Sequence, residues 1–279
     1  ELYTLAQYCD DLVPGLGGNL EPRFTFNIAI TDREQALTIF KKMQNNFLSV
    51  LYYFGGVIKL TQDSPSEAIA IVTNANVLEE GFNYSSIELD RQSNTVIVSY
   101  NEPLNNYSLT TETVYNNKLL NEVGVEVKKE LYAFGCTSRS QAHRLGKYQL
   151  LSDVLNSETV TYTAGLDHSS INVGEVIEIH DNNMPNSISG GRLVSMTDLI
   201  IVLDRDVTLL AGVTYFISIL DQNGIVQKLT IDPSNIGSIN TITVVDSKGF
   251  KANPYAIYGI SNSTDSTGEL YRVVDIKEN

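Results

Sequence analysis

The three histidines are the first residues to examine for chemistry, because imidazole ionises near neutral pH and binds metal ions. They are His143, His168 and His180. His168 follows Asp167 and His180 precedes Asp181, at either side of one predicted strand, so the two pairs could meet around a metal ion or in acid–base work. Polar residues beside the ends of a strand are more often structural, and we assign no metal ligand here.

The two cysteines, Cys9 and Cys136, are too few and too far apart for a disulfide framework or a structural zinc site. Cys136 precedes Ser138, the cap of a predicted helix, and a helix N-terminus can lower a thiol pKa. Its neighbours Phe134 and Gly135 indicate the end of a buried strand, so we predict packed, reduced thiols. No Gly-x-Ser-x-Gly elbow occurs, and no nucleophile is predicted.

Neither the glycine-rich loop nor the acidic clusters has the context of a binding site. The loop at residues 15–18 joins a predicted helix to a predicted strand, whereas a phosphate-binding loop leads from a strand into a helix. Asp204, Asp206 and Asp221 do not have the spacing of a calcium loop. The sequence therefore predicts no catalytic, cofactor-binding or metal-binding residue and no cofactor, and the protein is not expected to be an enzyme.

The charge balance is strongly acidic. The 279 residues include 19 basic and 33 acidic ones, for a formal net charge of −14. Such a surface repels phosphate backbones, so direct nucleic-acid binding is not expected. No apolar run reaches the roughly 18–20 residues that cross a bilayer, and no signal peptide is visible. Because the chain starts at Glu1 and stops directly after an apolar strand, we expect a fragment of a longer polypeptide.

Residues 1–80 have the pattern of a small α+β domain. A helix opens the chain and ends at Pro14, and the alternation over residues 24–30 predicts a half-buried strand. A capping box, Thr31 to Glu34, precedes a second helix. A hairpin and one further strand complete the predicted domain, at residues 50–54 and 57–60 with a turn at Gly55-Gly56, and at residues 69–72.

From about residue 81 the chain is mostly β, with one well-marked helix. Ser138 and Gln141 form a capping box, and an apolar stripe predicts a helix over about 138–155. Asn223-Gly224 indicates a tight hairpin, and short strands at this spacing favour a barrel or a sandwich. The stripe consists of Ala142, Leu145, Tyr148, Leu151 and Leu155, and strands are predicted at residues 95–100, 112–115, 159–163, 175–179, 192–195, 199–203, 215–220, 226–231, 241–245 and 270–276.

Several short segments match a known family in the same order. They are Leu2–Val13 followed by Glu21–Thr25, then Tyr53–Gly56, Ser99–Pro103, Ala133–Ser138, Gln141–Tyr148 and Gly174–Ile179. On these segments the chain resembles the host-specificity (tail tip attachment) protein J family of lambda-like siphophages. The match covers most of residues 1–180 and is architectural after Gly191.

This resemblance implies a trimeric hub at the distal end of a phage tail, built from β-barrel and α+β domains. Such a hub closes the tail tube and contacts copies of itself and other tail-tip and tail-tube proteins. It supports host attachment, and the parts that bind a host outer-membrane receptor are expected beyond this chain. The implied location is the virion tail, after assembly in the host bacterial cytoplasm. The resemblance transfers no catalytic residue.

The predicted fold class is α+β and mostly β, with a β-barrel typical of a tail hub and an inserted β-rich module. The strands at 175–179 and 270–276 are expected to belong to one barrel, with residues from 190 to about 262 inserted between them. Finding these two strands in separate sheets would reject that arrangement. The predicted domains are an α+β domain at 1–80, a tail-tube-like β-barrel domain at 81–190 with the helix at about 138–155, and the β-rich module at 191–279.

Two other functions remain open from the sequence. The C-terminal β region could itself be a receptor- or glycan-binding module of a tail fibre, since surfaces rich in Tyr and Asn suit such contacts. A hydrolase that opens the cell envelope would need at least a cleft with two carboxylates, or His168 and His180 together with a metal ion. The residues favour the hypothesis that the chain is a structural component of a tail tip.

Overall fold

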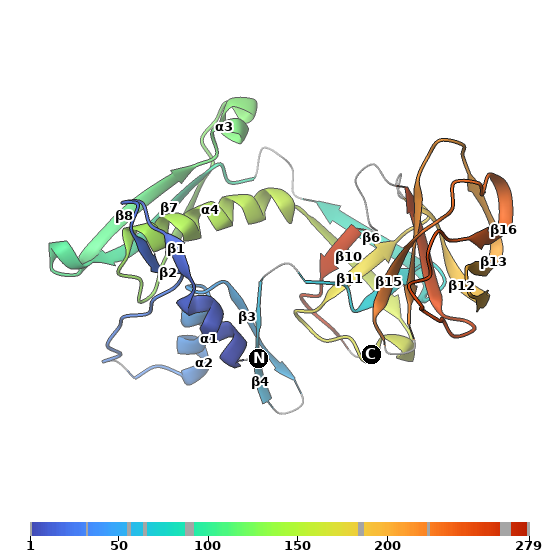
Figure 1. Cartoon of the computed structure of the whole chain (residues 1–279). Helices are drawn as coiled ribbons and strands as arrows, with labels where there is room; N and C mark the ends of the chain where they lie inside the picture. Colours follow the sequence, from blue (N-terminus) through green and yellow to red (C-terminus); the bar gives the residue numbers. More distant parts are fainter. Residues whose placement is uncertain are drawn as a thin grey trace. The chain divides into compact units, whose positions relative to one another are not determined.

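The computed structural model divides into two compact units, and each combines two separate stretches of the chain (Figure 1). Unit 1 contains residues 1–64 and 85–159, and unit 2 contains residues 65–84 and 160–279. As functional divisions of the intact protein, the three consecutive domains expected from the sequence stay a prediction. The structure describes residues 2–31, 33–54, 57–63, 66–86, 92–183, 187–221, 224–262 and 269–277.

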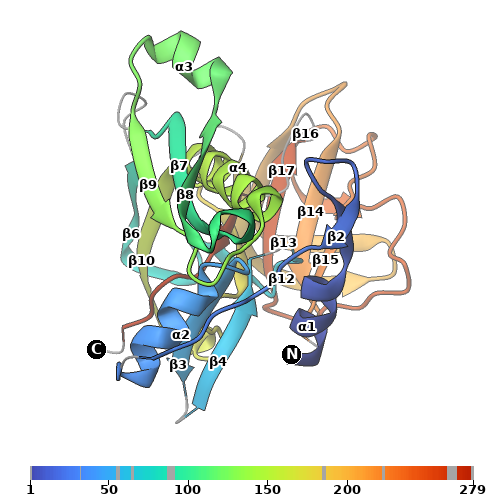
Figure 2. The same cartoon turned by 90° about the vertical axis from the view of Figure 1, so that its left-hand side faces the viewer.

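A long helix on a three-stranded sheet forms the centre of unit 1 (Figure 2). Strand β7 (Thr95–Glu102) lies in the middle, antiparallel to β8 (Ser108–Tyr115) and parallel to β9 (Lys128–Tyr132). Helix α4 (Arg139–Leu155) packs on β7 and β8. Gly146 allows this close approach, because a Cβ there would lie 2.7 Å from Val114 Cγ2. The core consists of Val96, Val98, Tyr100, Val114, Ala133, Cys136, Ala142, Leu145 and Leu150.

The first 62 residues surround this centre with short elements. The glycine loop at 15–18 joins two paired strands and binds through its own backbone, with Gly15 N donating to Asn19 O at 2.8 Å. The loop therefore connects β1 to β2, and not the predicted helix to the predicted strand. The elements are α1 (Leu2–Asp10), β1 (Leu12–Pro14), β2 (Leu20–Pro22), α2 (Ala36–Gln44), β3 (Ser49–Phe54) and β4 (Val57–Gln62), and unit 1 also contains η2 (Pro103–Asn105) and α3 (Asn117–Val123).

Three predictions for this region are wrong in detail. The first helix ends at Asp10, not Pro14, because the residues that follow pair as β1 with β2. Residues 24–30 are extended but form no ladder. The box from Thr31 to Glu34 does not cap α2, whose N-cap is the next residue and makes no side-chain hydrogen bond. The hairpin of β3 and β4 is confirmed by its antiparallel register, although its turn lies outside the described residues.

Helix α4 is confirmed, but half of its predicted apolar stripe is not buried. Ser138 Oγ accepts a hydrogen bond from Gln141 N at 3.3 Å, as the cap requires. Leu151 and Leu155 are 59% and 70% exposed. Successive steps of three residues fall about 60° short of a full helical turn, so the predicted stripe rotates away from the sheet. The buried residues are Gln141, Ala142, Leu145, Gly146 and Leu150.

Unit 2 begins with a small mixed sheet. Strand β11 (Val176–His180) pairs antiparallel with β18 (Glu269–Arg272) and parallel with β5 (Ala70–Thr73). The two strands expected to lie together, 175–179 and 270–276, are therefore confirmed as neighbours in one sheet. The assignment of strand 69–72 to the α+β domain is wrong, because it pairs with β11 in unit 2. A separate pair, β6 (Val77–Ser86) with β10 (Glu158–Ala164), and η3 (Leu166–His168) accompany this sheet.

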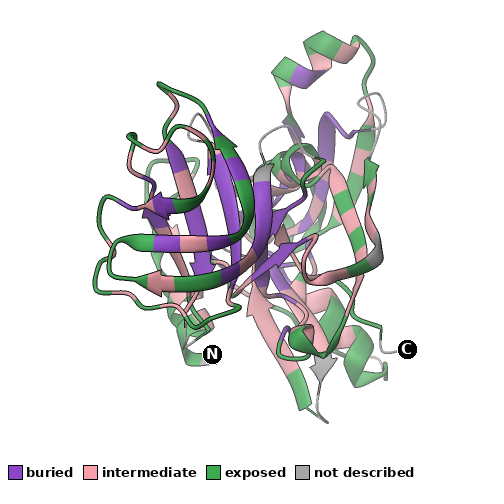
Figure 3. Cartoon of the chain, turned by 90° about the vertical axis from the view of Figure 1, so that its right-hand side faces the viewer, coloured by how far each residue is buried: buried purple, intermediate pink, exposed green. Residues whose placement is uncertain are grey.

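Six strands between β11 and β18 form the second sheet of unit 2. The inserted β-rich module is thus confirmed as a topological feature. Its strands lie in the order β15-β14-β17-β12-β13-β16, and a tightly buried apolar core lines it (Figure 3). They are β12 (Ser187–Thr197), β13 (Ile200–Leu209), β14 (Tyr215–Leu220), β15 (Val226–Thr230), β16 (Gly237–Thr243) and β17 (Ile257–Asn262).

The fold is mostly β with few helices, as predicted, but the described residues contain no closed barrel. Residues 81–190 contribute instead to the sheet under α4, to the β6–β10 pair and to β11. In the inserted module the two edge strands meet only through the isolated bridge Ile231–Val244. The β14–β15 hairpin is present with a loop over residues 221–225, longer than a two-residue turn, and Asn223 lies outside the described residues.

Candidate functional site

The polar residues of the matching segments meet at the first two turns of α4. Gln141 is almost fully buried, and its side chain binds the backbone of Thr25 on both sides. Its Oε1 accepts from Thr25 N at 3.0 Å, and its Nε2 donates to Thr25 O at 3.2 Å and to Asn46 Oδ1 at 3.0 Å. The side chain of Gln141 therefore makes the two hydrogen bonds to the backbone of Thr25 that a neighbouring strand would otherwise make.

An ion pair closes the same junction one turn later. Arg144 Nη1 donates to Glu21 Oε1 at 2.5 Å, and Arg144 Nη2 donates to Arg23 O at 2.8 Å. The Arg23 guanidinium lies 4.0 Å from the centre of the Tyr8 ring. These contacts fix α1 and β2 against α4, so we name Glu21, Thr25, Asn46, Gln141 and Arg144 the α4 junction.

The turn before α4 places a buried thiol beside this junction. Gly135 has φ of +76°, and a Cβ there would lie 2.6 Å from the Phe26 ring, so only glycine fits. Cys136 Sγ donates to Ser138 O at 3.3 Å. Burial raises the pKa of the Cys136 thiol. The packed thiol predicted at Cys136 is confirmed, whereas Cys9 is only partly buried.

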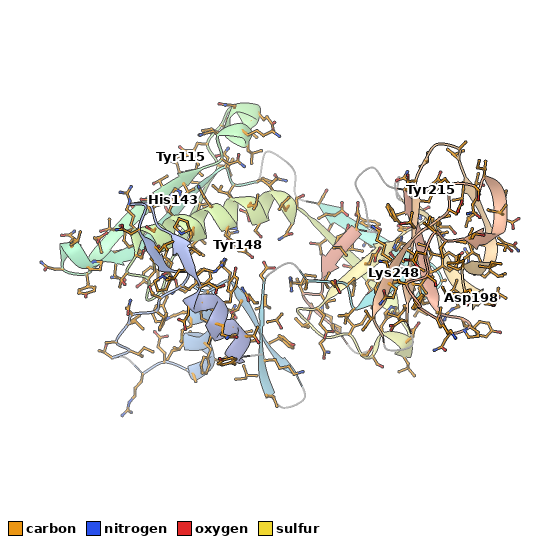
Figure 4. The ribbon with its side chains drawn as sticks, viewed as in Figure 1. Tyr115, His143, Tyr148, Asp198, Tyr215 and Lys248 are labelled. Carbon is orange, nitrogen blue, oxygen red and sulfur yellow. The ribbon has the colours of Figure 1, made fainter. Side chains whose placement is uncertain are left out.

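His143 lies on α4, where Figure 4 labels it, and belongs to a charged cluster on β8. Its Nδ1 lies 3.0 Å from Glu112 Oε1, and Arg139 Nε donates to Glu112 Oε2 at 2.7 Å. Burial alone raises the pKa of Glu112, but the hydrogen bonds from Arg139 and His143 outweigh it and hold that pKa below its ordinary value. The cluster fastens α4 to β8 and leaves the carboxylate saturated.

The other two histidines have separate partners in unit 2. His168 Nε2 lies 3.3 Å from Asn76 Nδ2, and burial lowers the pKa of His168. His180 is fully buried with Nε2 2.9 Å from Glu178 Oε1, which also accepts from Ser218 Oγ at 2.9 Å. Across the described ranges, no group of three or more His, Cys, Asp or Glu side chains could hold a metal ion.

The acidic residues considered from the sequence serve local structure. Asp204 Oδ1 accepts from Tyr258 OH at 3.0 Å and pairs with Arg205 at 3.2 Å. Burial raises the pKa of Asp204, but these hydrogen bonds outweigh it and hold the pKa below its ordinary value. Asp221 Oδ1 accepts from Ile225 N at 2.8 Å and so shapes its own hairpin loop.

Sequence reasoning missed the α4 junction as a structural unit. Its members lie up to 123 residues apart, and nothing in local periodicity links them. The available signal was that Glu21, Thr25, Gln141 and Arg144 all fall inside the matching segments. Glu178 was missed for another reason, because a single acidic residue in an apolar strand gives no indication of its buried partners. The arrangement supports rigid assembly and provides no reacting centre among the described residues.

The comparison with protein families decides the identity. Residues 26–194, more than half of the chain, match the family described as "Putative phage tail protein". The chain belongs to this family of phage tail proteins. The match includes Asn46, Gln141 and Arg144 of the α4 junction, but not Glu21 or Thr25. No helix in the part of the chain that the structure describes is both long and apolar enough to cross a membrane.

Two curated relatives of this phage tail protein are named "Tip attachment protein J". The protein of Escherichia phage SECphi4 is 26% identical over 99% of this chain, and that of Escherichia phage SECphi27 is also 26% identical over 99%. The chain spans only 24% and 23% of their lengths. Relatives and family are structural phage tail proteins, and the location that follows is the virion tail.

Two solved structures have a weak likeness to the phage tail protein. One is the 43 kDa tail protein of prophage MuSo2 from Shewanella oneidensis, with a TM-score of 0.40 and 12% identity over 79% of this chain and 57% of that one. The other belongs to the virion of a native gene transfer agent particle, with a TM-score of 0.43 and 10% identity over 82% of this chain and 41% of that one.

Proposed function

We propose that this chain is part of the hub at the tip of a bacteriophage or prophage tail, where it closes the tail tube and supports host attachment. The observation that carries the proposal is the match of almost the whole chain to two proteins named for tip attachment. In the intact protein we propose a homotrimer in contact with other tail-tip and tail-tube proteins. Receptor contacts would lie in the parts of those longer proteins outside this chain.

The side chains support an architectural role with no enzymatic activity. Buried polar groups such as Gln141, Glu178 and Glu112 are occupied by structural partners within their own unit. Buried polar groups whose hydrogen-bonding atoms are already paired make a scaffold rigid. Those atoms are then not offered to a substrate. A hydrolase would need converging ionisable groups that the described residues do not bring together.

Antibodies against this chain test the location. Virions of the encoding phage should bind gold-labelled antibody at the distal tip of the tail, and antibody pre-absorbed with the chain should leave the tip unlabelled. Labelling of the head or of the tail shaft alone would contradict a tip hub. Sedimentation of the intact protein tests the trimer separately. A monomer would contradict the proposed homotrimer but would not contradict the location at the tail tip.

The inserted module favours one alternative, a direct receptor- or glycan-binding role. Residues 187–262 form a complete sheet placed between two paired strands, as an added recognition module would be. Leu210, Ile236 and Tyr255 are 63%, 55% and 74% exposed on it. If this module binds the host, the labelled chain should bind host cells, and changing these three residues to Ser should abolish binding. The matched change Leu104→Ser in unit 1 should not.

A further inference from the structure

The β3–β4 hairpin is an incomplete sheet. It is a two-stranded ribbon, and no third strand pairs with it in the described part of the chain. Its antiparallel register pairs Leu51 with Leu60 and Phe54 with Val57 along the backbone. Val57 and Ile58 are 59% and 49% exposed. A two-stranded ribbon alone is marginally stable in water. This ribbon contacts α2 through β3 but has no third strand among the described residues, so it can still join another sheet.

Strand β8 provides an open edge in the same unit. It pairs with β7 on one side only, and the sheet order ends with it. Asn116 N donates to Asn94 O at 2.8 Å, which sets the alternation of the antiparallel ladder. By that alternation the backbone groups of Leu109, Thr111 and Thr113 point away from β7. The alternate residues of this eight-residue edge strand therefore offer backbone N–H and C=O groups to an incoming strand.

The other edge of this sheet, β9, is protected against pairing with another strand, whereas β8 is not. Strand β9 is shorter and begins with Lys128 and Lys129, and lysines on an edge strand disfavour pairing with another chain. Along β8 the residues that point away from α4 are uncharged, namely Leu109, Thr111, Thr113 and Tyr115. Its one charged residue, Glu112, lies on the buried face with Arg139 and His143.

The distribution of charge favours a second copy of this chain as the occupant. At a net charge of −14, copies repel each other unless the contacting surfaces lack acidic groups. Residues 35–62, which include the whole hairpin, contain no Asp or Glu. The exposed side of β8 contains none either. These two surfaces of unit 1 can therefore meet with little repulsion, and both have the β-branched and aromatic residues that favour strand pairing.

We propose that the β3–β4 hairpin of one copy adds to the β8 edge of a second copy. The contact is head-to-tail, since hairpin and edge are different surfaces, and such a contact closes into a ring or continues as a chain of copies. It deepens the self-association in the proposed function, and rests on it, by naming the strands that make the contact.

Sedimentation of the full chain over a range of concentrations tests this. The chain should self-associate, and Ile58→Lys on the hairpin or Thr111→Pro on the edge should each weaken association about tenfold or more. Thr111→Pro removes an outward N–H and no bond to β7. Thr111→Lys is a second edge variant in case the proline disturbs folding, which circular dichroism would report. Val194→Lys, with 52% exposure on β12 in unit 2, is the matched control and should change nothing.

Mixing the two variants gives the decisive result. A copy with Ile58→Lys keeps its edge, and a copy with Thr111→Pro keeps its hairpin, so the mixture should form a dimer with one copy of each although neither variant associates alone. A wild-type monomer at every concentration, no heterodimer in the mixture, or equal loss in Val194→Lys would each overturn the inference. Tip labelling of virions together with any of these results would leave the proposed function standing.

Discussion

The two units of this phage tail protein are held together in different ways. In unit 1 the helix α4 is fixed by side-chain hydrogen bonds from Gln141, Arg144 and Glu112 to distant segments. In unit 2 the inserted module depends on continuous strand ladders around an apolar core, and glycines let its strands approach the neighbouring sheet. The difference teaches that the stability of unit 1 should respond most to the loss of polar side chains, and that of unit 2 to changes in side-chain volume.

The largest expected effect is at Gly259 in β17. A Cβ there would lie 2.3 Å from the ring of His180, which is fully buried and cannot move aside. Gly259→Ala should therefore destabilise unit 2 by about 3 kcal/mol through overpacking. Thermal denaturation followed by hydrogen exchange would locate the loss. Gly17→Ala, with no atom within 4 Å of the new Cβ, is the control and should be near neutral. If Gly259→Ala is as stable as the wild type, the stability of unit 2 does not depend on close packing at this glycine.

The second prediction concerns Gln141. Gln141→Ala leaves the backbone N–H and C=O of Thr25 without their partner, so unit 1 should lose about 2 kcal/mol. Hydrogen exchange of residues 20–30 should rise while that of unit 2 stays unchanged. Lys147→Ala on the exposed side of the same helix is the matched control. If hydrogen exchange rises in both units, the α4 junction stabilises more than unit 1.

The third prediction is the acid dependence that Glu112 gives to the stability of unit 1. The pKa of Glu112 is lower folded than unfolded, so its contribution is present above the unfolded pKa and is lost as pH falls through the folded one. Unit 1 should therefore lose stability below about pH 4.3, the ordinary glutamate pKa. Glu112→Gln should flatten that profile. Chemical denaturation at several acidic pH values measures it, and an unchanged slope in Glu112→Gln would assign the dependence to other carboxylates, such as Asp153.

Local patterns predicted most elements because each depends on neighbouring residues. The α4 cap at Ser138, the hairpin at β3–β4 and the strand at β11 all follow from spacing within a few positions. The return of residues 269–272 to β11 was also anticipated, since both segments are short apolar strands flanking a β-rich stretch.

Long-range partners could not be predicted from local patterns. Residues 24–30 alternate like a strand, yet they bind Gln141 and Gly135, more than a hundred residues away. The barrel expected at 81–190 fails for the same reason, because strand count does not state which strands pair. The α4 junction and the Glu178 cluster consist of such distant contacts, and only the order of matching segments hinted at the first of them.

The last prediction compares the two halves of α4, and its smallest expected effect is at Leu155. Leu145 is 6% exposed against the sheet, whereas Leu155 is 70% exposed although the sequence placed both on one stripe. Leu145→Ala should cost unit 1 about 3 kcal/mol through a cavity, while Leu155→Ala should stay within about 0.5 kcal/mol. Urea denaturation of the two variants measures both. The two substitutions are chemically identical, so they differ only in what surrounds the side chain. A large loss of stability in Leu155→Ala would therefore require a contact at Leu155 that the single chain does not show. A neighbouring protein that covers the end of α4 would provide that contact.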